Sequence, residues 1–280
     1  NIDAMAAKSY VLGMAQRPFP AYDPKWQLVC MLCTELPTID NGLAKIEQQP
    51  DGRDGIALTY TIRPEATWGD GTPLTTDDVL FTYQVGRHPQ SGVSNAELYR
   101  RIPGIDAIDA KAFVMHLGRV EFEYNAINDF RPLPAHLERP VFEADPVAYR
   151  NRTIFDAEPA NPGLYFGPYR ITEVSSGAFI VLEPNPNYGG GRVREPGRIR
   201  WVPHGSALVE DYVADAPPTY LAAAHALDVR NPTTTIERFI LTTHRAPFDN
   251  PDLRKAVAFA LNRTELARDS GVLAPTEQFL

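Results

Sequence analysis

The sequence contains no apolar run long enough to cross a membrane. A transmembrane helix needs about 18 or more apolar residues, and the most apolar short run, residues 220–227 (YLAAAHAL), is less than half that length and includes a histidine. Basic residues are also scarce, since 27 Lys and Arg stand against 35 Asp and Glu, giving a net charge of −8. Because phosphates and anionic lipids are bound through clustered Lys and Arg, we expect no nucleic acid and no anionic membrane as partner.

Sequence signatures of catalysis are missing as well. No G-x-S-x-G surrounds a serine, and no G-x-G-x-x-G follows a strand and opens a helix. Carboxylates are plentiful but form no recognisable catalytic pair. The histidines show neither H-x-x-x-H nor H-E-x-x-H spacing and are scattered over six positions, His88, His116, His136, His204, His225 and His244. We therefore expect a protein that is not an enzyme and that has no cofactor and no metal site.

Cysteine is limited to Cys30 and Cys33, which form a C-x-x-C. A redox pair needs an exposed thiolate at a helix N-terminus, whereas this pair lies inside LVCMLC with no preceding turn and no Gly or Pro between the cysteines. Because a free cysteine often packs as a small hydrophobe, the pattern favours two core cysteines, with a strained disulfide or a redox role as the alternative. No signal peptide is visible at Asn1, so the protein is either cytosolic or numbered from a processed end.

The composition that is present is typical of a globular protein. The chain has 280 residues, of which 44% are hydrophobic and 22% charged, enough for one large domain or two ordinary ones. The 26 prolines and 19 glycines indicate frequent turns. Strand and helix patterns both occur, without an internal repeat, which suggests an α/β or α+β protein.

Hydrophobic periodicity predicts the main elements. Alternation over residues 58–62 predicts a strand with one buried face, and Ser175-Ser176-Gly177 predicts a hairpin turn. The region 130–162, with six prolines, is expected to be irregular. Further strands are expected at 9–15, 112–117, 169–174, 178–183, 199–202 and 239–243, and helices at 27–36, 207–213 and, after Asn250 and Pro251, at 253–261.

Residues 66–83 (ATWGDGTPLTTDDVLFTY) combine acidic residues with glycines, as calcium-binding loops also do. Counting from Asp70, however, the fifth and twelfth positions of an EF-hand loop would be Leu74 and Phe81, neither of which can bind calcium. The residues instead predict a tight turn, with Thr75 capping a helix and Asp78 supporting its first turn.

Four motifs in sequence order resemble one known family. Residues 60–84 (YTIRPEATWGDGTPLTTDDVLFTYQ) resemble the signature of the family 5 extracellular solute-binding proteins, the receptors of ABC importers for peptides, nickel complexes and oligosaccharides. The other three motifs are YDPKWQ at 22–27, GPYRITEVSSGAFIVLEPNPNY at 167–188 and RAPFDNPDLRKAVAFALNR at 245–263. Together they span most of the chain, which makes the resemblance specific.

The resemblance implies an α/β fold, namely the two-lobed clamp of a type II periplasmic binding protein with an inserted subdomain in lobe I. Lobe I would combine residues 1–36 with 162–235, and the inserted subdomain would cover 37–161. Residues 236–280 would begin lobe II, which is otherwise largely missing. Ligand would bind in the cleft between the lobes, which closes around it.

Two departures from the family pattern bear on this expectation. Members of the family are considerably longer than this chain, and most of lobe II lies beyond the matching segment. The family's Gly-Glu-x-Asp-like turn after the predicted helix is replaced by DAPPTYLAAAHAL, residues 215–227. We therefore expect a fragment, or a second chain or segment that completes lobe II.

The resemblance also suggests where ligand is contacted. In the family, the segment after the early Asp-Pro, the loop before Gly-Pro-Tyr and the crossing strand line the cleft. Trp26 is suited to stacking or to forming an apolar wall, although Trp26 and Tyr165 could equally be packing residues. The candidate ligand-binding residues are Trp26, Gln27, Leu164, Tyr165, Phe166, Thr242, Thr243 and His244.

The leading functional hypothesis is a monomeric receptor that captures a peptide or similar small-molecule or oligomeric solute and delivers it to an ABC permease in the membrane. Such a receptor would work in the bacterial periplasm or attached to the cell envelope, with its signal peptide removed. One alternative is a solute-binding-like sensor module of a regulator. Another is a thiol redox protein that uses Cys30 and Cys33.

Overall fold

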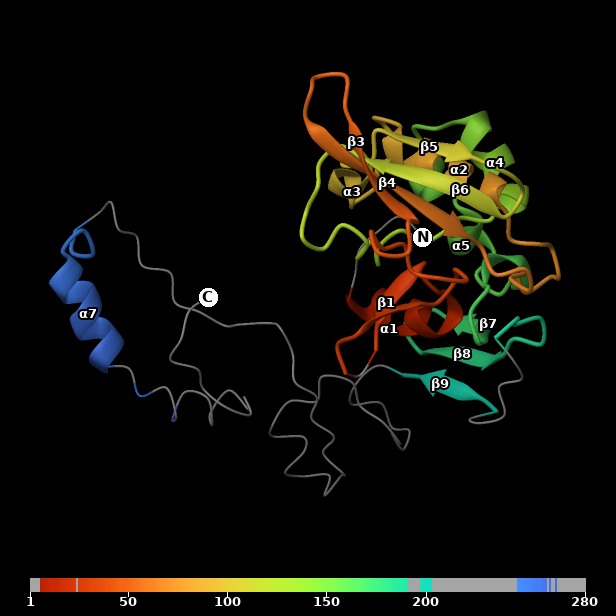
Figure 1. Cartoon of the computed structure of the whole chain (residues 1–280). Coiled ribbons are helices and arrows are strands. Elements are labelled where there is room, and N and C mark those ends of the chain that lie inside the picture. Colours follow the sequence, from red (N-terminus) through yellow and green to blue (C-terminus); the bar gives the residue numbers. More distant parts are fainter. Residues whose placement is uncertain are drawn as a thin grey trace. The chain divides into compact units, whose positions relative to one another are not determined.

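The computed structural model describes residues 6–23, 25–190, 197–202 and 246–260, together with Asn262 and Glu265 (Figure 1). The chain divides into two compact units, Asn1–Ser206 and Ala207–Leu280, and each is treated by itself. None of the helices in the described ranges combines the length and apolar character needed to cross a bilayer.

The first unit is built from short strands and helices, and the described part of the second unit includes the helix α7. The elements of the first unit are α1 (Ala6–Ala15), β1 (Pro20–Tyr22), β2 (Leu28–Cys30), β3 (Ala44–Gln48), β4 (Asp54–Thr61), α2 (Thr76–Arg87), α3 (Ala96–Arg100), β5 (Gly104–Ala107), β6 (Ala112–Leu117), α4 (Ala135–Ala144), η1 (Tyr149–Asn151), α5 (Ile154–Ala157), η2 (Pro162–Leu164), β7 (Tyr169–Ser175), β8 (Phe179–Pro184) and β9 (Ile199–Trp201). The helix of the second unit is α7 (Pro251–Ala260).

The largest sheet has four antiparallel strands in the order β3-β4-β6-β5. Along β4, the side chains of Ile56, Leu58 and Tyr60 are buried while the residues between them are partly exposed. This alternation confirms the strand with one buried face that was predicted from the alternating apolar and polar residues at 58–62. The strand predicted at 112–117 is β6. Helix α2 contacts α3, α4 and β5, and Figure 1 shows these helices gathered beside the four strands.

A second antiparallel sheet has the order β7-β8-β9. Its first two strands form the predicted hairpin, and Gly177 in the turn has a φ of 73°, a conformation that glycine adopts without strain. The strand predicted at 199–202 is β9. Helix α1 packs against β7, and β1 and β2 form a separate antiparallel pair.

Two hydrophobic cores stabilise the first unit. One lies against the four-stranded sheet, and its centre is an aromatic group in which Phe19 contacts Tyr60 and Phe113 at ring distances of 5.4 and 5.2 Å. The other joins α1, α2, α4 and the β7–β8 hairpin through residues that include Val11, Phe81 and Leu182. Several distant segments therefore fold together within one unit.

The strand predicted at 9–15 is wrong, because these residues belong to helix α1. Val11 and Ala15 are four residues apart and both are buried in the second core, the spacing at which one face of a helix meets its neighbours. A short apolar run fits a buried strand and a buried helix equally well.

The helix predicted at 27–36 is also wrong, and the residues form β2 followed by bends. The carbonyls of Cys30 and Met31 accept hydrogen bonds from the guanidinium of Arg63 at 3.4 and 3.1 Å, so a distant side chain binds carbonyls that a helix would use internally. Cys30 and Cys33 are joined by a disulfide with a Cα–Cα distance of 5.4 Å. The expectation of two free core cysteines is therefore wrong, although Cys33 itself is fully buried.

The region 130–162 is not irregular throughout, because it contains helix α4. Pro140 lies inside this helix, where it removes one backbone donor. The helix persists because Ala135, Glu138 and Phe142, which share one helical face, are buried. Packing on that face outweighs the low helix propensity of proline.

In the second unit, α7 confirms the helix predicted after Asn250 and Pro251. The Asn250 side chain accepts a hydrogen bond from the Asp252 amide at 2.8 Å, as expected of an N-cap. The predicted helix at 207–213 and strand at 239–243 lie outside the described residues, and the proposed domain boundaries stay a prediction.

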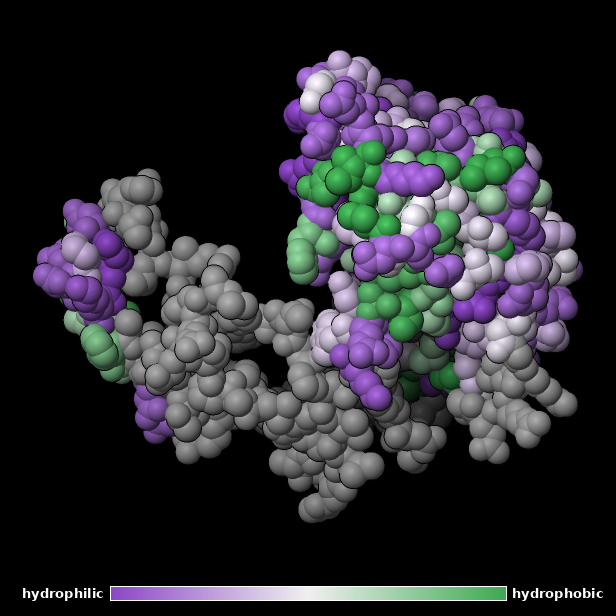
Figure 2. All heavy atoms as spheres, in the orientation of Figure 1, coloured by the Kyte–Doolittle hydropathy of each residue, from purple (hydrophilic) through white to green (hydrophobic). Residues whose placement is uncertain are grey.

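The visible face of the first unit is mainly hydrophilic, with apolar patches over the region of the four-stranded sheet and of β1 and α1 (Figure 2). The exposed large apolar side chains of this unit include Ile46, Ile108 and Phe122, and Phe122 is 98% exposed. Apolar residues exposed singly are normal on a protein surface.

Candidate ligand-binding site

The loop between β1 and β2 is a tight turn held together by Asp23. Its carboxylate accepts hydrogen bonds from the amides of Lys25 and Gln27, both at 2.8 Å. Two further backbone bonds of 2.9 Å join the Asp23 amide to the Gln27 carbonyl and the Trp26 amide to the Asp23 carbonyl. Trp26 has a φ of 60°, a left-handed conformation that is unfavourable for a bulky residue. The hydrogen bonds of the turn thus hold the backbone of Trp26 in this conformation.

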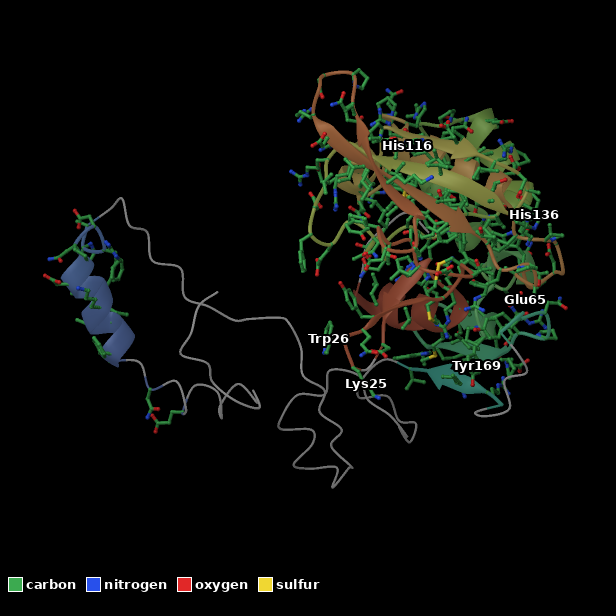
Figure 3. All side chains as sticks on the ribbon, in the orientation of Figure 1. Lys25, Trp26, Glu65, His116, His136 and Tyr169 are labelled. Carbon is green, nitrogen blue, oxygen red and sulfur yellow. A yellow bond between two sulfur atoms is a disulfide. The ribbon has the colours of Figure 1, made fainter. Side chains whose placement is uncertain are left out.

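Trp26 and its neighbour Tyr22 present an exposed pair of aromatic rings. Trp26 is 48% and Tyr22 36% exposed, and their ring centroids lie 5.9 Å apart. Figure 3 shows Lys25 and Trp26 at the edge of the first unit, and Gln27 is exposed beside them. Such a surface can stack against planar or apolar groups, and Gln27 can add hydrogen bonds to it.

The loop that follows β6 lies beside this aromatic pair. The Tyr22 hydroxyl donates a hydrogen bond to the Glu123 carboxylate at 3.3 Å. Burial, the negative charge of Glu123 and this hydrogen bond raise the pKa of Tyr22 above its ordinary value. The exposed ring of Phe122 comes from the same loop. Sequence reasoning missed Glu123 and Phe122, because no local pattern reports a contact between residues 101 positions apart.

Three of the predicted ligand contacts have buried side chains. Leu164 is 0%, Tyr165 1% and Phe166 4% exposed. The Phe166 ring meets the Trp68 ring edge-on, with 4.9 Å between their centroids, and the Tyr165 hydroxyl donates to the Pro159 carbonyl. The structure therefore uses these side chains for packing and does not bring them to the exposed surface at Trp26. Their contact with ligand stays a prediction.

The remaining predicted contacts, Thr242, Thr243 and His244, lie outside the described residues. Of the eight candidates, Trp26 and Gln27 are those that the structure places on an exposed surface. No group of three or more His, Cys, Asp or Glu side chains in the described ranges is arranged to hold a metal ion.

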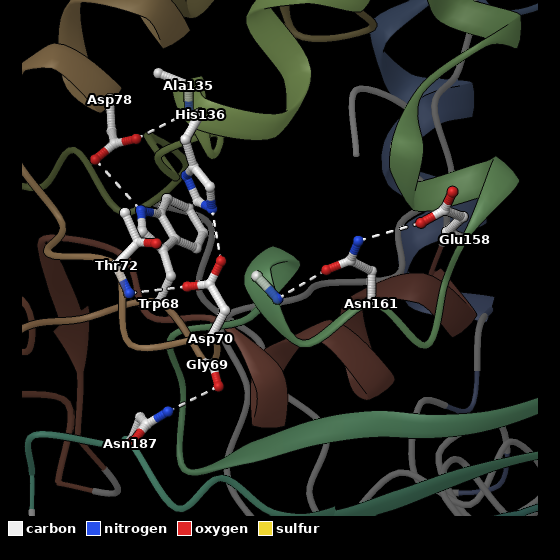
Figure 4. Close-up of polar contacts among 11 residues, drawn as sticks. Trp68, Gly69, Asp70, Thr72, Asp78, Ala135, His136, Glu158, Asn161 and Asn187 are labelled. Atoms are coloured by element: carbon white, nitrogen blue, oxygen red, sulfur yellow. Dashed lines mark hydrogen bonds and ion pairs between the residues drawn. The ribbon is translucent and has the colours of Figure 1, made fainter.

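The Gly-Asp-Gly turn takes part in an internal network (Figure 4). Asp70 accepts hydrogen bonds from the Thr72 amide and His136, both at 2.9 Å. Burial acts to raise the pKa of Asp70, but these bonds and the nearby His136 outweigh it, so the pKa lies below its ordinary value. The predicted start of helix α2 after Thr75 is confirmed, because the Asp78 carboxylate accepts a 2.8 Å hydrogen bond from the Thr75 amide.

Asp78 also joins this turn to α4. Its carboxylate accepts hydrogen bonds from the Trp68 indole at 3.3 Å and from the Ala135 amide at 2.9 Å, and its side chain is almost completely buried. Burial raises the pKa of Asp78, and the hydrogen bonds oppose that rise only in part.

The same turn also meets the segments on either side of β7 and β8. The Gly69 amide donates to the Tyr165 carbonyl at 2.6 Å, and the Gly69 carbonyl accepts from Asn187 at 2.9 Å. A Cβ added at Gly69 would lie 2.5 Å from the backbone carbonyl oxygen of Pro162, so the chain needs glycine there. We call residues 66–78 with these partners the junction; its polar groups are satisfied internally, and its role is structural.

Comparison with known proteins agrees with the fold. A profile of the bacterial extracellular solute-binding proteins, family 5, matches residues 39–275. A solved structure of the oligopeptide-binding protein of Thermus thermophilus, complexed with a pentapeptide, superimposes with a TM-score of 0.60 and 26% identity, covering 72% of this chain and 37% of that one.

Two relatives from Brucella are also similar. A protein of Brucella melitensis named as a binding protein is 31% identical over 139 residues, which is 48% of this chain and 20% of the relative. A protein of Brucella ovis named as an ABC transporter peptide-binding protein is 26% identical over 70% of this chain and 33% of the relative. The chain thus spans about a fifth to a third of the length of these relatives. With the profile matching most of its residues, this chain belongs to the family 5 bacterial extracellular solute-binding proteins.

Proposed function

We propose that this chain is part of a non-enzymatic receptor that captures a peptide or a similar oligomeric solute and delivers it to an ABC permease. The observation that carries the proposal is the exposed Trp26–Tyr22 pair on a turn fixed by Asp23. Because the turn already fixes the backbone that carries Trp26, less of the chain has to be ordered when ligand binds. The similarity to a peptide-bound structure from Thermus thermophilus supports a peptide as ligand.

The proposal extends to the arrangement of the whole receptor. Ligand would lie in a cleft between two lobes, with Trp26 and Gln27 on the first lobe and Thr242, Thr243 and His244 on the strand that crosses between them. Closure of the lobes would present the loaded form to the permease, because ligand favours the closed conformation. The receptor would act as a monomer in the bacterial periplasm or at the cell envelope.

Calorimetric titration of the full-length protein with a pentapeptide library tests this function. Trp26→Ala should weaken binding by at least about 30-fold, as expected for a central aromatic contact. Val147→Ala is the control, since Val147 is similarly exposed between α4 and η1 and should leave affinity unchanged. If no peptide binds to the wild-type protein, the peptide-receptor proposal is wrong; if Trp26→Ala binds normally, Trp26 is not part of the site.

A further inference from the structure

Two glutamates of the loop after β6 differ sharply in their partners. Glu121 forms ion pairs with both Arg101 and Arg119. Glu123, two residues later, accepts a hydrogen bond from the Tyr22 hydroxyl, and in the described part of the chain no Lys or Arg nitrogen lies within 4.0 Å of its carboxylate. Glu123 is exposed, so it offers a negative charge that the described residues do not neutralise.

The loop is held in place around Glu123. The Tyr124 hydroxyl accepts a hydrogen bond from the Ile39 amide at 3.2 Å, and the Asn125 side chain donates to the Pro37 carbonyl at 2.9 Å. Before Glu123 in the sequence, Glu121 is held by Arg101 and Arg119, so the residues that flank Glu123 are fixed on both sides. The Glu123 carboxylate is therefore presented beside Tyr22 by a preorganised loop and not by a freely moving one.

The chemistry of this arrangement matches a positively charged group. A cation lying on the face of Trp or Tyr, within about 6 Å of the ring centre, is attracted by the ring's negative face. Tyr22 contacts both Trp26 and Glu123, so two aromatic rings and one carboxylate lie next to one another. Neutral ligands would gain the stacking but not the charge interaction.

We propose that Tyr22, Trp26 and Glu123 form a subsite for a cationic group of the ligand, an ammonium or guanidinium. This inference rests on the proposed receptor function, and it adds a preference for charge. The ammonium could be the amino terminus of a peptide or a lysine side chain. Glu123 recognises both through the same chemistry, a charge-assisted hydrogen bond.

The test titrates three pentapeptides into the full-length protein: an acetylated peptide with one lysine, an uncharged acetylated peptide with leucine in its place, and the leucine peptide with a free amino terminus. At least one cationic peptide should bind about tenfold tighter than the uncharged peptide. Glu123→Gln should abolish this preference without weakening the uncharged peptide. The preference should also shrink as salt concentration increases.

Glu143→Gln is the matched control, because Glu143 is an exposed carboxylate on α4 and the substitution changes net charge equally. It should retain the preference, and melting curves should show all variants folded. The two cationic peptides separate terminal amine from lysine as the recognised group. If Glu123→Gln retains the preference, or the wild type shows none while still binding peptides, the subsite is wrong and the receptor function stands. If no peptide binds, the receptor proposal fails and this inference fails with it.

Discussion

The junction and the turn of residues 23–27, called here the Trp26 turn, are both built around an aspartate and a tryptophan, but one buries the tryptophan ring and the other exposes it. In each turn an aspartate side chain accepts a hydrogen bond from the amide two residues later, Asp70 from Thr72 and Asp23 from Lys25. Trp68 is fully buried and its indole donates to Asp78, whereas Trp26 is 48% exposed. The same local chemistry therefore supports packing in one place and an exposed contact surface in the other.

This difference separates stability from binding. The junction satisfies its polar groups internally and joins three segments of the first unit, so changes there should alter the free energy of unfolding. The Trp26 turn is bound mainly to itself, so changes in its exposed side chains should alter ligand affinity and leave unfolding nearly unchanged. The following substitutions test that separation.

A large effect on stability is expected for Asp78→Ala. The change leaves the Thr75 and Ala135 amides and the Trp68 indole without their acceptor in a buried site. Since an unsatisfied buried donor costs about 1–3 kcal/mol, the free energy of unfolding should fall by at least about 3 kcal/mol. Urea denaturation measures this change.

Asp77→Ala is the control for this substitution, because Asp77 lies in the same segment of the junction but outside its buried hydrogen-bond network. The Asp77 side chain is 68% exposed and pairs with Arg139, so its loss should change the free energy of unfolding by no more than about 1 kcal/mol. Equal effects of the two substitutions would contradict the structural role given to the junction.

The next effect concerns the disulfide that follows the Trp26 turn. Replacing Cys30 and Cys33 together by serine opens a loop with a sequence separation of 3, and chain entropy predicts a loss of about 2 kcal/mol of unfolding free energy. The wild type in excess reductant should lose the same amount. Because Cys33 is fully buried, the native disulfide should resist mild thiol reagents; rapid exchange with them would instead favour the redox alternative.

The sequence predicts well those elements whose signals are local. The alternation in β4, the turn glycine of the β7–β8 hairpin and the Asn250 cap of α7 each depend on neighbouring residues, and all three are confirmed. The apolar runs at 9–15 and 27–36 were predicted wrongly because their partners lie far away in sequence. Residues 9–15 pack on β7, and the carbonyls after β2 bind Arg63.

The candidate site shows the same limit. Resemblance to the family pointed to Trp26 and Gln27, which are exposed, but also to the buried Tyr165 and Phe166. A motif identifies the family, but it does not say which of its side chains are buried and which are exposed. Glu123 could not be found at all, because its place beside Tyr22 depends on the fold that brings two loops together.

A smaller and pH-dependent effect on stability is expected for the buried carboxylate of Glu138. Glu138 is fully buried and accepts a 2.9 Å hydrogen bond from the Ile154 amide. Burial raises the pKa of Glu138, so the folded protein binds this proton more tightly than the unfolded chain. The associated stability is fully present below the unfolded pKa of about 4.3 and is lost as pH rises through the folded pKa.

Glu138→Gln keeps an acceptor for the Ile154 amide but has no proton to lose. Its melting temperature relative to the wild type should therefore increase as pH is raised from about 4 to about 7. Parallel melting temperatures for Glu138→Gln and the wild type over this range would contradict the effect of burial.

The smallest effect on stability is expected at Trp26 itself. Glycine adopts the φ of 60° found there without strain, which offsets the entropy that glycine loses on folding, so Trp26→Gly should change the free energy of unfolding by less than about 1 kcal/mol. Trp68→Ala is the counterpart in the junction and should cost about 3–5 kcal/mol, because it empties a fully buried site. Urea denaturation gives both values, and calorimetry should show that Trp26→Gly loses peptide affinity. If Trp26→Gly instead destabilises the protein as strongly as Trp68→Ala, the exposed ring supports the fold, and the separation between the two turns does not hold.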